Sequence, residues 1–451
     1  MNIVIIGDGK VGTTLSRQLQ YEGHSIVVID NDQNALKNSI NSQDIMCVAG
    51  NGATIDVQLE AGVNKADLVI ACTSQDELNM LCCLIAKKLG ANKTIARVRT
   101  PEYFAQLGAI KDELGLSMAI NPELAAATEM SRVFLFPAAT KVELFAKGRV
   151  ELVEFKLADN SILDYVSLSD LYKKYKIKIL VCAVERGSDV FIPNGDFVLR
   201  SGDRLSITGL HSEIEKFFKS IGQVVNKVKD VLIVGGGRIG YYLAKQLQTL
   251  DMNVKIIEQD IETCKRLSEA LPKVTIIHGN GNDHGVLKEE GIESADGFAA
   301  LTGIDEENII MSMIAASNNV TKVVTKVNLS TYAEMAEKLG LESIIAPKNV
   351  VANNIISYVR AMQNSYESNV ETLYKLIDNR VEAVEFVVKQ NGKCTGIPLK
   401  NLKVKKNILI ACIVRNRKVI FPDGNECILA GDSVILVTTN QRFNDIEDIL
   451  E

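Results

Sequence analysis

The sequence lacks any apolar run long enough to cross a membrane. A spanning helix needs roughly 20 apolar residues, whereas a strongly apolar stretch such as Ile408–Val414 runs for only seven. The opening MNIVIIG has no basic leader and no cleavage site, so we expect a strand there rather than a signal peptide.

Absent too is any excess of basic residues, since 50 Lys and Arg stand against 56 Asp and Glu and the net charge is −6. This balance argues against a general nucleic-acid binder and against adhesion to anionic lipid. Hydrophobic residues make up 47% and charged residues 24%, which is ordinary for a globular protein. A chain of 451 residues is too long for one compact core, and about two to four domains are expected.

Cysteine pairs at metal-binding or redox spacing are also missing, because none of the nine cysteines forms a CxxC motif. Several lie inside apolar runs, where a free thiol behaves as a small hydrophobic side chain: Cys47, Cys72, Cys182 and Cys412. We therefore expect a reduced, cytoplasmic protein. Histidines number only four, and His278 and His284 beside Asp283 have no further His or Cys partner, so no metal site is expected.

What the sequence does contain is a glycine-rich turn at its start. An apolar run leads into Gly7, Gly9 and Gly12, and a helical pattern then leads to a second apolar run that ends at Asp30. In such a strand–turn–helix–strand unit the first glycine permits a tight turn, the second lets the backbone approach a pyrophosphate, and the third lets helix and strand pack closely. The helix N-terminus offers free amide groups to phosphates. Asp30 can accept hydrogen bonds from a ribose and would repel a 2′-phosphate, which favours NAD over NADP.

Strand-like runs then alternate with helical patterns, which predicts a doubly wound parallel sheet of about six strands. The further runs are Ile45–Ala49, Leu68–Thr73, Thr94–Arg99 and Ser117–Asn121. Ligands of such sheets bind at the carboxyl ends of the strands, and this places Asn51, Thr73 and Arg97 on the same rim as the glycine turn. An arginine leaving a buried strand needs an anion, so Arg97 is either a ligand contact or part of a structural ion pair.

The second half of the chain repeats the first. The glycines of GGGRIG follow those of GDGKVG by 228 residues, and Glu258 stands 18 residues after Gly240, as Asp30 does after Gly12. The tails lose the helix alternation, and Asn194-Gly195 and Asp423-Gly424 predict hairpin turns in small β-rich modules. We therefore predict an α/β protein of two tandem Rossmann-like doubly wound parallel sheets, each followed by a small α+β C-terminal module. The expected domains are residues 1–140, 145–220, 229–355 and 372–451.

Two apolar helical segments separate the large modules from the small ones, around Leu124–Phe136 and Val350–Met362. Each carries an apolar stripe at helical spacing. The stripes are either ordinary core or faces that cross to a neighbouring domain, where they would pair the two halves or assemble subunits.

This arrangement resembles the RCK (KTN plus C-terminal) domain family, in the tandem form of the Trk potassium-uptake regulators. The resemblance covers essentially the whole chain, and its most specific marks are IGDGKVG with Asp30, TSQDELN, IARVR and their recurrence. It implies a regulator without catalytic turnover. Such a protein would form a homo-oligomeric, tetrameric ring on the cytoplasmic face of the cell membrane, against a TrkH-like potassium channel or transporter subunit. It would bind NAD(H), or ATP or ADP in the same sites, and change the activity of the pore.

The resemblance also implies two sets of site residues. The first is Gly7, Gly9, Val11, Gly12, Asp30, Thr73 and Arg97, and the second is Gly235, Gly237, Ile239, Gly240 and Glu258. Neighbouring motif positions complete the candidate cofactor-binding set: Asp8, Lys10, Asn51, Ser74, Gly236 and Arg238. The cations Lys10 and Arg238 could reach phosphates or point to solvent.

The two sites are not expected to be equal. Lys326 stands where the first half has Arg97, so the second site lacks a bidentate fork for phosphate or carboxylate. We hypothesise that the halves hold different nucleotides, or that the second binds weakly.

An NAD-dependent oxidoreductase is the main alternative, because fold alone does not decide function. Such an enzyme needs a proton donor beside the nicotinamide. Of two Tyr-x-x-x-Lys matches, Tyr241–Lys245 falls in the helix after the second glycine turn, and Tyr172–Lys176 has no equivalent in the repeat. A DNA-binding regulator would need a recognition helix and a basic face, and we identify neither.

Overall fold

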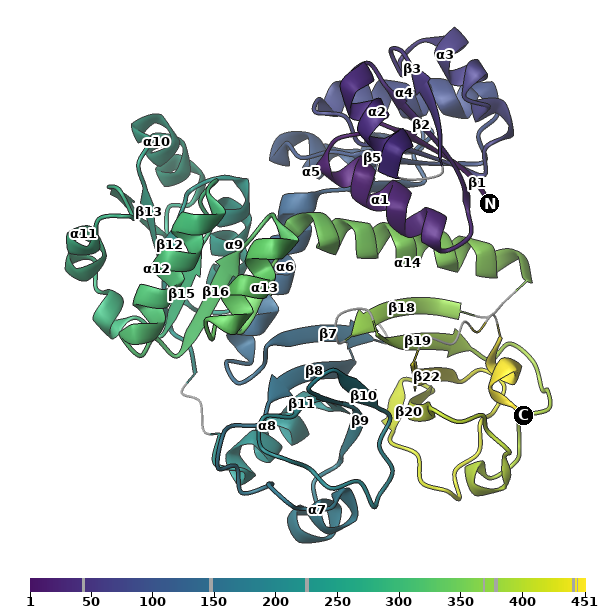
Figure 1. Cartoon of the computed structure of the whole chain (residues 1–451), viewed down its shortest axis with the longest axis vertical. Helices are drawn as coiled ribbons and strands as arrows, with labels where there is room; N and C mark the ends of the chain where they lie inside the picture. The colour runs from purple at the N-terminus through teal and green to yellow at the C-terminus, as the bar shows by residue number, and fades with distance from the viewer. Residues whose placement is uncertain are drawn as a thin grey trace.

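The computed structural model describes the whole chain except residues 43–44, 146–148, 224–226, 368–369, 377–379, 440–442 and 444. Two larger α/β units and two smaller β-rich units are visible in Figure 1, with long helices running between them. None of the helices in the described part is both long and apolar enough to span a bilayer.

The first α/β unit is a six-stranded parallel sheet in the order β3-β2-β1-β4-β5-β6. Its strands are β1 (Asn2–Ile6), β2 (Ser25–Asp30), β3 (Met46–Ala49), β4 (Leu68–Ala71), β5 (Lys93–Arg97) and β6 (Met118–Ile120). Its helices are α1 (Lys10–Tyr21), α2 (Gln33–Ser42), α3 (Ile55–Glu60), α4 (Asp76–Leu89) and α5 (Pro101–Ile110). The strand order reverses between β1 and β4, which is where ligands of such sheets bind.

The second α/β unit has the same topology, β14-β13-β12-β15-β16-β17. Its strands are β12 (Asp230–Val234), β13 (Asn253–Glu258), β14 (Thr275–His278), β15 (Gly297–Ala300), β16 (Lys322–Lys326) and β17 (Ser343–Ile345). Its helices are α9 (Arg238–Thr249), α10 (Ile261–Ala270), α11 (His284–Glu289), α12 (Asp305–Ser317) and α13 (Ser330–Lys338). The predicted fold class is confirmed: two Rossmann-like sheets in tandem, each followed by a small module.

Each small module is an antiparallel five-stranded sheet. The first contains β7 (Lys141–Phe145), β8 (Val150–Lys156), β9 (Ile179–Arg186), β10 (Asp189–Phe191) and β11 (Arg204–Gly209), with α7 (Leu168–Tyr175) and α8 (His211–Ser220). The second contains β18 (Val370–Leu376), β19 (Val381–Val387), β20 (Ile408–Arg415), β21 (Lys418–Ile420) and β22 (Ser433–Thr438). The two sheets share one apolar core to which both modules contribute side chains.

The predicted hairpin turns were misplaced. Asn194-Gly195 and Asp423-Gly424 lie in the loops after β10 and β21, where Asn194 and Asp423 each accept a backbone N–H two residues on. The short hairpins instead turn at Gly187 and at Asn416-Arg417, which have positive φ angles. Asn-Gly and Asp-Gly serve local side-chain turns as well as hairpins, and the pattern alone did not separate the two.

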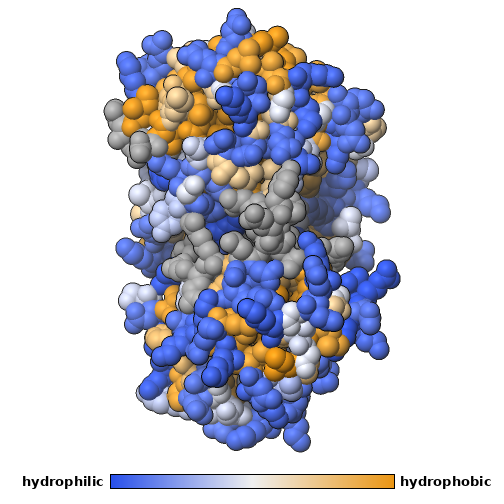
Figure 2. Space-filling view, turned by 90° about the vertical axis from the view of Figure 1, so that its right-hand side faces the viewer, coloured by the Kyte–Doolittle hydropathy of each residue, from blue (hydrophilic) through white to orange (hydrophobic). Residues whose placement is uncertain are grey.

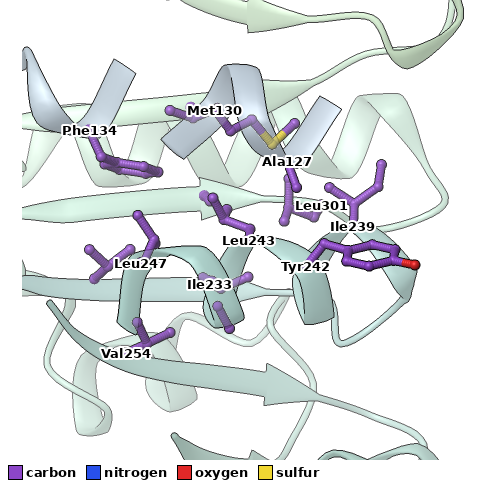
Figure 3. Close-up of a cluster of buried hydrophobic side chains, with 14 of the residues drawn as sticks. Ala127, Met130, Phe134, Ile233, Ile239, Tyr242, Leu243, Leu247, Val254 and Leu301 are labelled. Atoms are coloured by element: carbon purple, nitrogen blue, oxygen red, sulfur yellow. The ribbon is translucent and has the colours of Figure 1, made fainter. Parts of the chain in front are cut away.

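The two helices between large and small modules cross from one half of the chain to the other. Helix α6 (Pro122–Leu135) follows the first sheet but packs its buried face on α9 of the second unit, and α14 (Pro347–Glu367) follows the second sheet but packs on α1 of the first. Figure 3 shows Ala127, Met130 and Phe134 of α6 above Leu243 and Leu247 of α9. The apolar stripes therefore cross between domains and join the two halves.

The surface is apolar in places over the first α/β unit, which occupies the top of Figure 2. Large apolar side chains exposed on this unit include Met46 of edge strand β3 and Ile55 of α3. Exposed apolar side chains scattered on a surface are common in soluble domains, and these residues carry no part of the site described below.

Candidate functional site

The glycines of the first turn have three distinct structural roles. Gly7 has a φ of +106°, and a Cβ there would lie 2.9 Å from the backbone nitrogen of Thr73. A Cβ on Gly12 would lie 1.9 Å from the carbonyl oxygen of Gly7, so only glycine lets α1 start this close to β1. A Cβ on Gly9 would meet nothing within 4 Å, which leaves its backbone open to a ligand. The second turn repeats this pattern at Gly235, Gly237 and Gly240.

The acid at the end of the second strand contacts the turn directly. The backbone N–H of Asp8 donates to Asp30 Oδ2 at 2.6 Å, and that of Asp32 donates to Oδ1 at 2.8 Å. In the second unit, Gly236 and Asp260 donate to Glu258 in the same way, at 2.7 and 2.9 Å. Each carboxylate oxygen keeps a further lone pair for a hydroxyl donor such as a ribose.

A cavity of about 730 Å³ opens at the first turn, at the carboxyl ends of the strands. Nine site residues predicted in the first half line it: Gly7, Gly9, Lys10, Val11, Asp30, Asn51, Thr73, Ser74 and Arg97. Asp8 and Gly12 belong to the turn but not to the lining. The carboxylate of Asp8 is buried and accepts hydrogen bonds from Ser39 and Thr13, and burial raises its pKa. Asp8 therefore holds the turn in shape instead of facing the cavity.

The far wall of this cavity comes from the second half of the chain. Its lining residues there are Ile239, Lys326, Asn328, Pro347 and Lys348. The sequence motifs assign Ile239 and Lys326 to the second site, because motif spacing does not indicate which surfaces of the two α/β units face each other. Because α6 packs on the second α/β unit and α14 packs on the first, the ligand-binding edges of the two sheets lie close together. The first site is therefore shared between the halves.

Arg97 is a partly buried cation facing this cavity. One Nη donates to the carbonyl oxygen of Thr73, while Nε has no hydrogen-bond partner. Among the described residues no carboxylate lies within ion-pair distance of Arg97, and burial lowers its pKa. The neighbouring Arg99 does form an ion pair, donating from Nε to Glu123 at 2.7 Å. The structural ion pair considered for Arg97 is thus absent from the described part of the chain, and its guanidinium is available to an anion.

Lys326 occupies the place of Arg97 in the second unit. Its Nζ donates to the carbonyl oxygen of Thr302 at 2.7 Å, and burial lowers its pKa. A lysine here offers a single ammonium, whereas arginine offers a planar fork. The two units therefore differ in the hydrogen bonds that this position can offer a ligand.

Two asparagines that the sequence analysis did not single out, one in each α/β unit, hold the strand ends at the two sites in place. Asn79 Oδ1 accepts from the backbone N–H of Thr73 at 2.7 Å, and its Nδ2 donates to the carbonyl oxygen of Arg97 at 2.9 Å. Asn308 makes the equivalent bonds to Thr302 and Lys326. The signal was present in the sequence, because TSQDELN and TGIDEEN end on these two residues.

The residues that would support an oxidoreductase lie elsewhere. Neither Tyr-x-x-x-Lys pair lines the cavity. On α9 the ammonium of Lys245 lies 5.8 Å from the ring centre of Tyr241, and the hydroxyl of Tyr172 accepts the backbone N–H of Val181 inside the first small module. Within the described residues no three His, Cys, Asp or Glu side chains are grouped as they would be around a metal ion.

Solved structures with the same fold include the GsuK channel. The GsuK channel bound to NAD superposes with a TM-score of 0.64 at 17% identity, over 97% of this chain and 77% of the channel chain. GsuK bound to ADP superposes with a TM-score of 0.52 at 16% identity, over 80% of this chain and 69% of that one. At this identity the likeness shows the fold.

Family models and full-length relatives are more specific. The TrkA-N domain model matches residues 3–122 and 231–347, and the TrkA-C domain model matches residues 152–222 and 383–451. The Trk system potassium uptake protein TrkA homolog of Archaeoglobus fulgidus is 32% identical over 449 residues, which cover 100% of both chains. The Trk system potassium uptake protein TrkA of Halomonas elongata is 31% identical over 455 residues, covering 100% of this chain and 99% of the relative. The chain belongs to the TrkA family, with two TrkA-N and two TrkA-C domains in tandem.

Proposed function

We propose that the chain is the cytoplasmic regulatory subunit of a Trk-type potassium uptake system, and that it binds NAD(H), ATP or ADP and gates a TrkH-like membrane subunit without catalytic turnover. The names of its full-length relatives support the transport system, and the NAD and ADP complexes of GsuK support the ligand class. The observation that carries the proposal is the cavity at the first glycine turn, since residues of both halves line it. By the same likeness we propose a tetrameric ring on the inner face of the membrane.

The residues of the first cavity suit the parts of an adenine nucleotide. The free amide groups at the start of α1 and the open backbone at Gly9 would receive the phosphates, and Asp30 would accept the hydroxyls of the adenosine ribose. Four cations that line the cavity have no carboxylate partner among the described residues: Lys10, Arg97, Lys326 and Lys348. Two come from each half, so the phosphate charge would be neutralised jointly.

Joint lining explains how binding could change the shape of the protein. A ligand shifts a conformational equilibrium only by the difference in its affinity for the two states. A nucleotide held by Lys10 and Arg97 on one side and Lys326 and Lys348 on the other would favour the closed arrangement of the two α/β units. The ring and the membrane subunit would then respond to that closure.

The second glycine turn, with Gly235, Gly236, Gly237, Arg238, Gly240 and Glu258, is proposed as a second nucleotide site. Glu258 accepts a hydrogen bond from the backbone of its glycine turn, as Asp30 does, which supports the same role toward a ribose. The residue equivalent to Arg97 is Lys326, which lines the first cavity, so the second turn has no arginine at this rim. We therefore expect weaker binding there or a different preference among nucleotides.

The test is calorimetric titration of the full chain with NADH, ADP and ATP. Asp30→Ala should abolish the stronger binding event, and Glu258→Ala, its matched control on the other turn, should leave that event unchanged. Arg97→Met should weaken binding roughly tenfold to hundredfold, because a charge-assisted contact is lost. It should leave the Tm without ligand unchanged or higher, since the carbonyl oxygen of Thr73 still accepts a hydrogen bond from Asn79 Nδ2. Equal dissociation constants for the wild type and Asp30→Ala would exclude the assigned site.

A second experiment tests the regulatory role separately. The chain is reconstituted with its membrane subunit in liposomes, and potassium flux is measured with and without each nucleotide. We expect flux to depend on nucleotide in the wild type and to lose that dependence in Asp30→Ala. Nucleotide binding without any effect on flux would refute the gating role and leave the binding site intact.

A further inference from the structure

A buried ion-pair triad joins the first α/β unit to the second small module, at the C-terminal end of helix α1. Arg360 of α14 donates from Nε and Nη2 to the two carboxylate oxygens of Glu22, at 2.9 and 2.6 Å, and from Nη1 to Glu382 at 3.0 Å. The three side chains are only 13%, 5% and 9% exposed. Glu22 ends α1 of the first α/β unit, and Glu382 lies on β19 of the second small module. Arg360 is therefore the shared partner of the two modules.

Helix α1 connects this triad to the nucleotide site. The helix begins directly after Gly9, where the phosphates are proposed to bind, and Glu22 caps its C-terminal end. Its inner face packs on α14 through a continuous buried core that contains Leu15, Leu19 and Ile355. A helix with such a face moves as a rigid element, so a displacement of α1 at the phosphate end also acts on the two-point contact between Glu22 and Arg360.

The packing of α6 on α9, which is the equivalent contact between the halves, lacks this charged link. Aligning the repeats at Gly12 and Gly240 pairs Glu22 with Leu250, and aligning them at Pro122 and Pro347 pairs Arg360 with Leu135. Between α6 and α9 the described contacts are neutral: Ser131 Oγ donates to Gln246 Oε1 at 2.8 Å, and Gln246 Nε2 donates to Thr128 at 2.9 Å. Helix α6 contacts the first small module through one longer ion pair, Arg132 Nη1 to Glu143 at 3.8 Å, which does not include α9. The two halves are thus alike in fold but differ in how the α/β unit is joined to the small module.

We propose that the Glu22–Arg360–Glu382 triad transmits occupancy of the first nucleotide site to the second small module, in the opposite half of the chain. This rests on the proposed function, because the first site must bind nucleotide. A buried, bidentate arginine pair is sensitive to small displacements, since an ion pair taken out of water is favourable only in good geometry. The neutral contacts between α9 and α6, and the single 3.8 Å contact between Arg132 and Glu143, change less in energy for the same displacement than a bidentate pair does. The second site is therefore coupled less strongly to the first small module.

The test is hydrogen exchange of the full chain, with and without saturating ADP. We expect ADP to slow exchange of the amides of β19 and β22 by about threefold or more, and to change β8 and β9 of the first small module less, through the core that the two modules share. ADP that binds and leaves β19 unchanged, or that protects both small modules equally, would overturn the proposal while the proposed function stands. A chain that binds neither ADP nor NADH would overturn both.

Two variants separate coupling from stability. Glu382→Leu removes the contact with the small module and keeps the Glu22–Arg360 pair. Arg360→Met with Glu22→Gln and Glu382→Gln removes the whole triad without leaving a buried charge unpaired. Both should bind ADP within about threefold of the wild type and lose the ADP-dependent protection of β19. The matched control is Ser131→Ala at the α6–α9 crossing, which should keep that protection. A variant that lowers the Tm but keeps the ADP effect would show a purely structural role and overturn the proposal.

Discussion

At the scale of single residues, one glycine of the first turn is required for packing and another is open to a ligand. Gly12 is required by the approach of α1 to the carbonyl of Gly7, whereas Gly9 has open space beside it. The same sequence motif therefore contains one residue whose replacement tests packing and one whose replacement tests binding.

Gly12→Ala should destabilise the chain by more than about 2 kcal/mol, because the new methyl group must displace backbone. Gly9→Ala should keep the Tm within about 2 °C of the wild type and weaken nucleotide binding at least tenfold, since the methyl group would occupy the space of the phosphates. Thermal melts and calorimetry measure the two effects. Loss of stability in Gly9→Ala would mean that the open space beside this glycine serves the fold.

Glu129 supplies a pH test at the same scale. It lines a cavity of about 420 Å³ between α6, α14 and the first small module, together with Arg132, Lys141, Glu143 and Glu154. Burial raises the pKa of Glu129 from 4.5 to about 7, although the nearby Lys141 opposes this. The folded state thus favours the protonated acid. The stability it adds is complete below pH 4.5 and is lost as the pH rises through about 7.

We therefore expect the Tm of the wild type to fall relative to that of Glu129→Gln when the pH is raised from 6 to 8, by about 1–3 °C. Scanning calorimetry at fixed ionic strength gives the comparison. Parallel Tm curves for the two proteins across this range would show that Glu129 does not titrate there.

At the scale of elements, the sequence was informative where the signal is local. The strand–turn–helix order, the acids at the ends of β2 and β13 and the internal repeat all follow from spacing, and they predicted both Rossmann-like sheets. The shared wall of the first cavity could not be predicted, because Lys326 and Lys348 reach it only through the crossing of α6 and α14. The stripe on α6 showed an apolar face without showing which domain it covers.

The crossing makes an element-level prediction about Met130, which is fully buried where α6 packs on α9. Met130→Ala should destabilise the chain by about 2–5 kcal/mol, and the increase in hydrogen exchange should be greatest in the second α/β unit, although Met130 belongs to the first half. The control is Leu135→Ala on the same helix, whose side chain is 42% exposed and whose loss should change stability by less than about 0.5 kcal/mol. Loosening confined to the first unit would contradict the packing.

At the scale of the whole molecule, the two halves complete one another. Helix α14 covers α1, helix α6 covers α9, and the small modules share a core. Neither half can bury its own apolar faces without the other, so the two halves of the chain pack together as two subunits of a dimer would.

A fragment of residues 1–223 should therefore not be monomeric. Without α14 the apolar face of α1 is uncovered, and two fragments can exchange α6 to cover it. Light scattering after size-exclusion chromatography should give a dimer or larger species at micromolar concentration, and the full chain under the same conditions serves as control. A stable, cooperatively folding monomer would show that each half is self-sufficient.

The central claim is that a nucleotide binds between the first glycine turn and the second half of the chain. A structure of the full chain determined in millimolar ADP or NADH tests it most directly. The account predicts adenosine at Asp30 and phosphates bounded by Gly9 and Arg97 on one side and Lys326 and Lys348 on the other. Ligand density elsewhere, or a first cavity without ligand under saturating conditions, would contradict it.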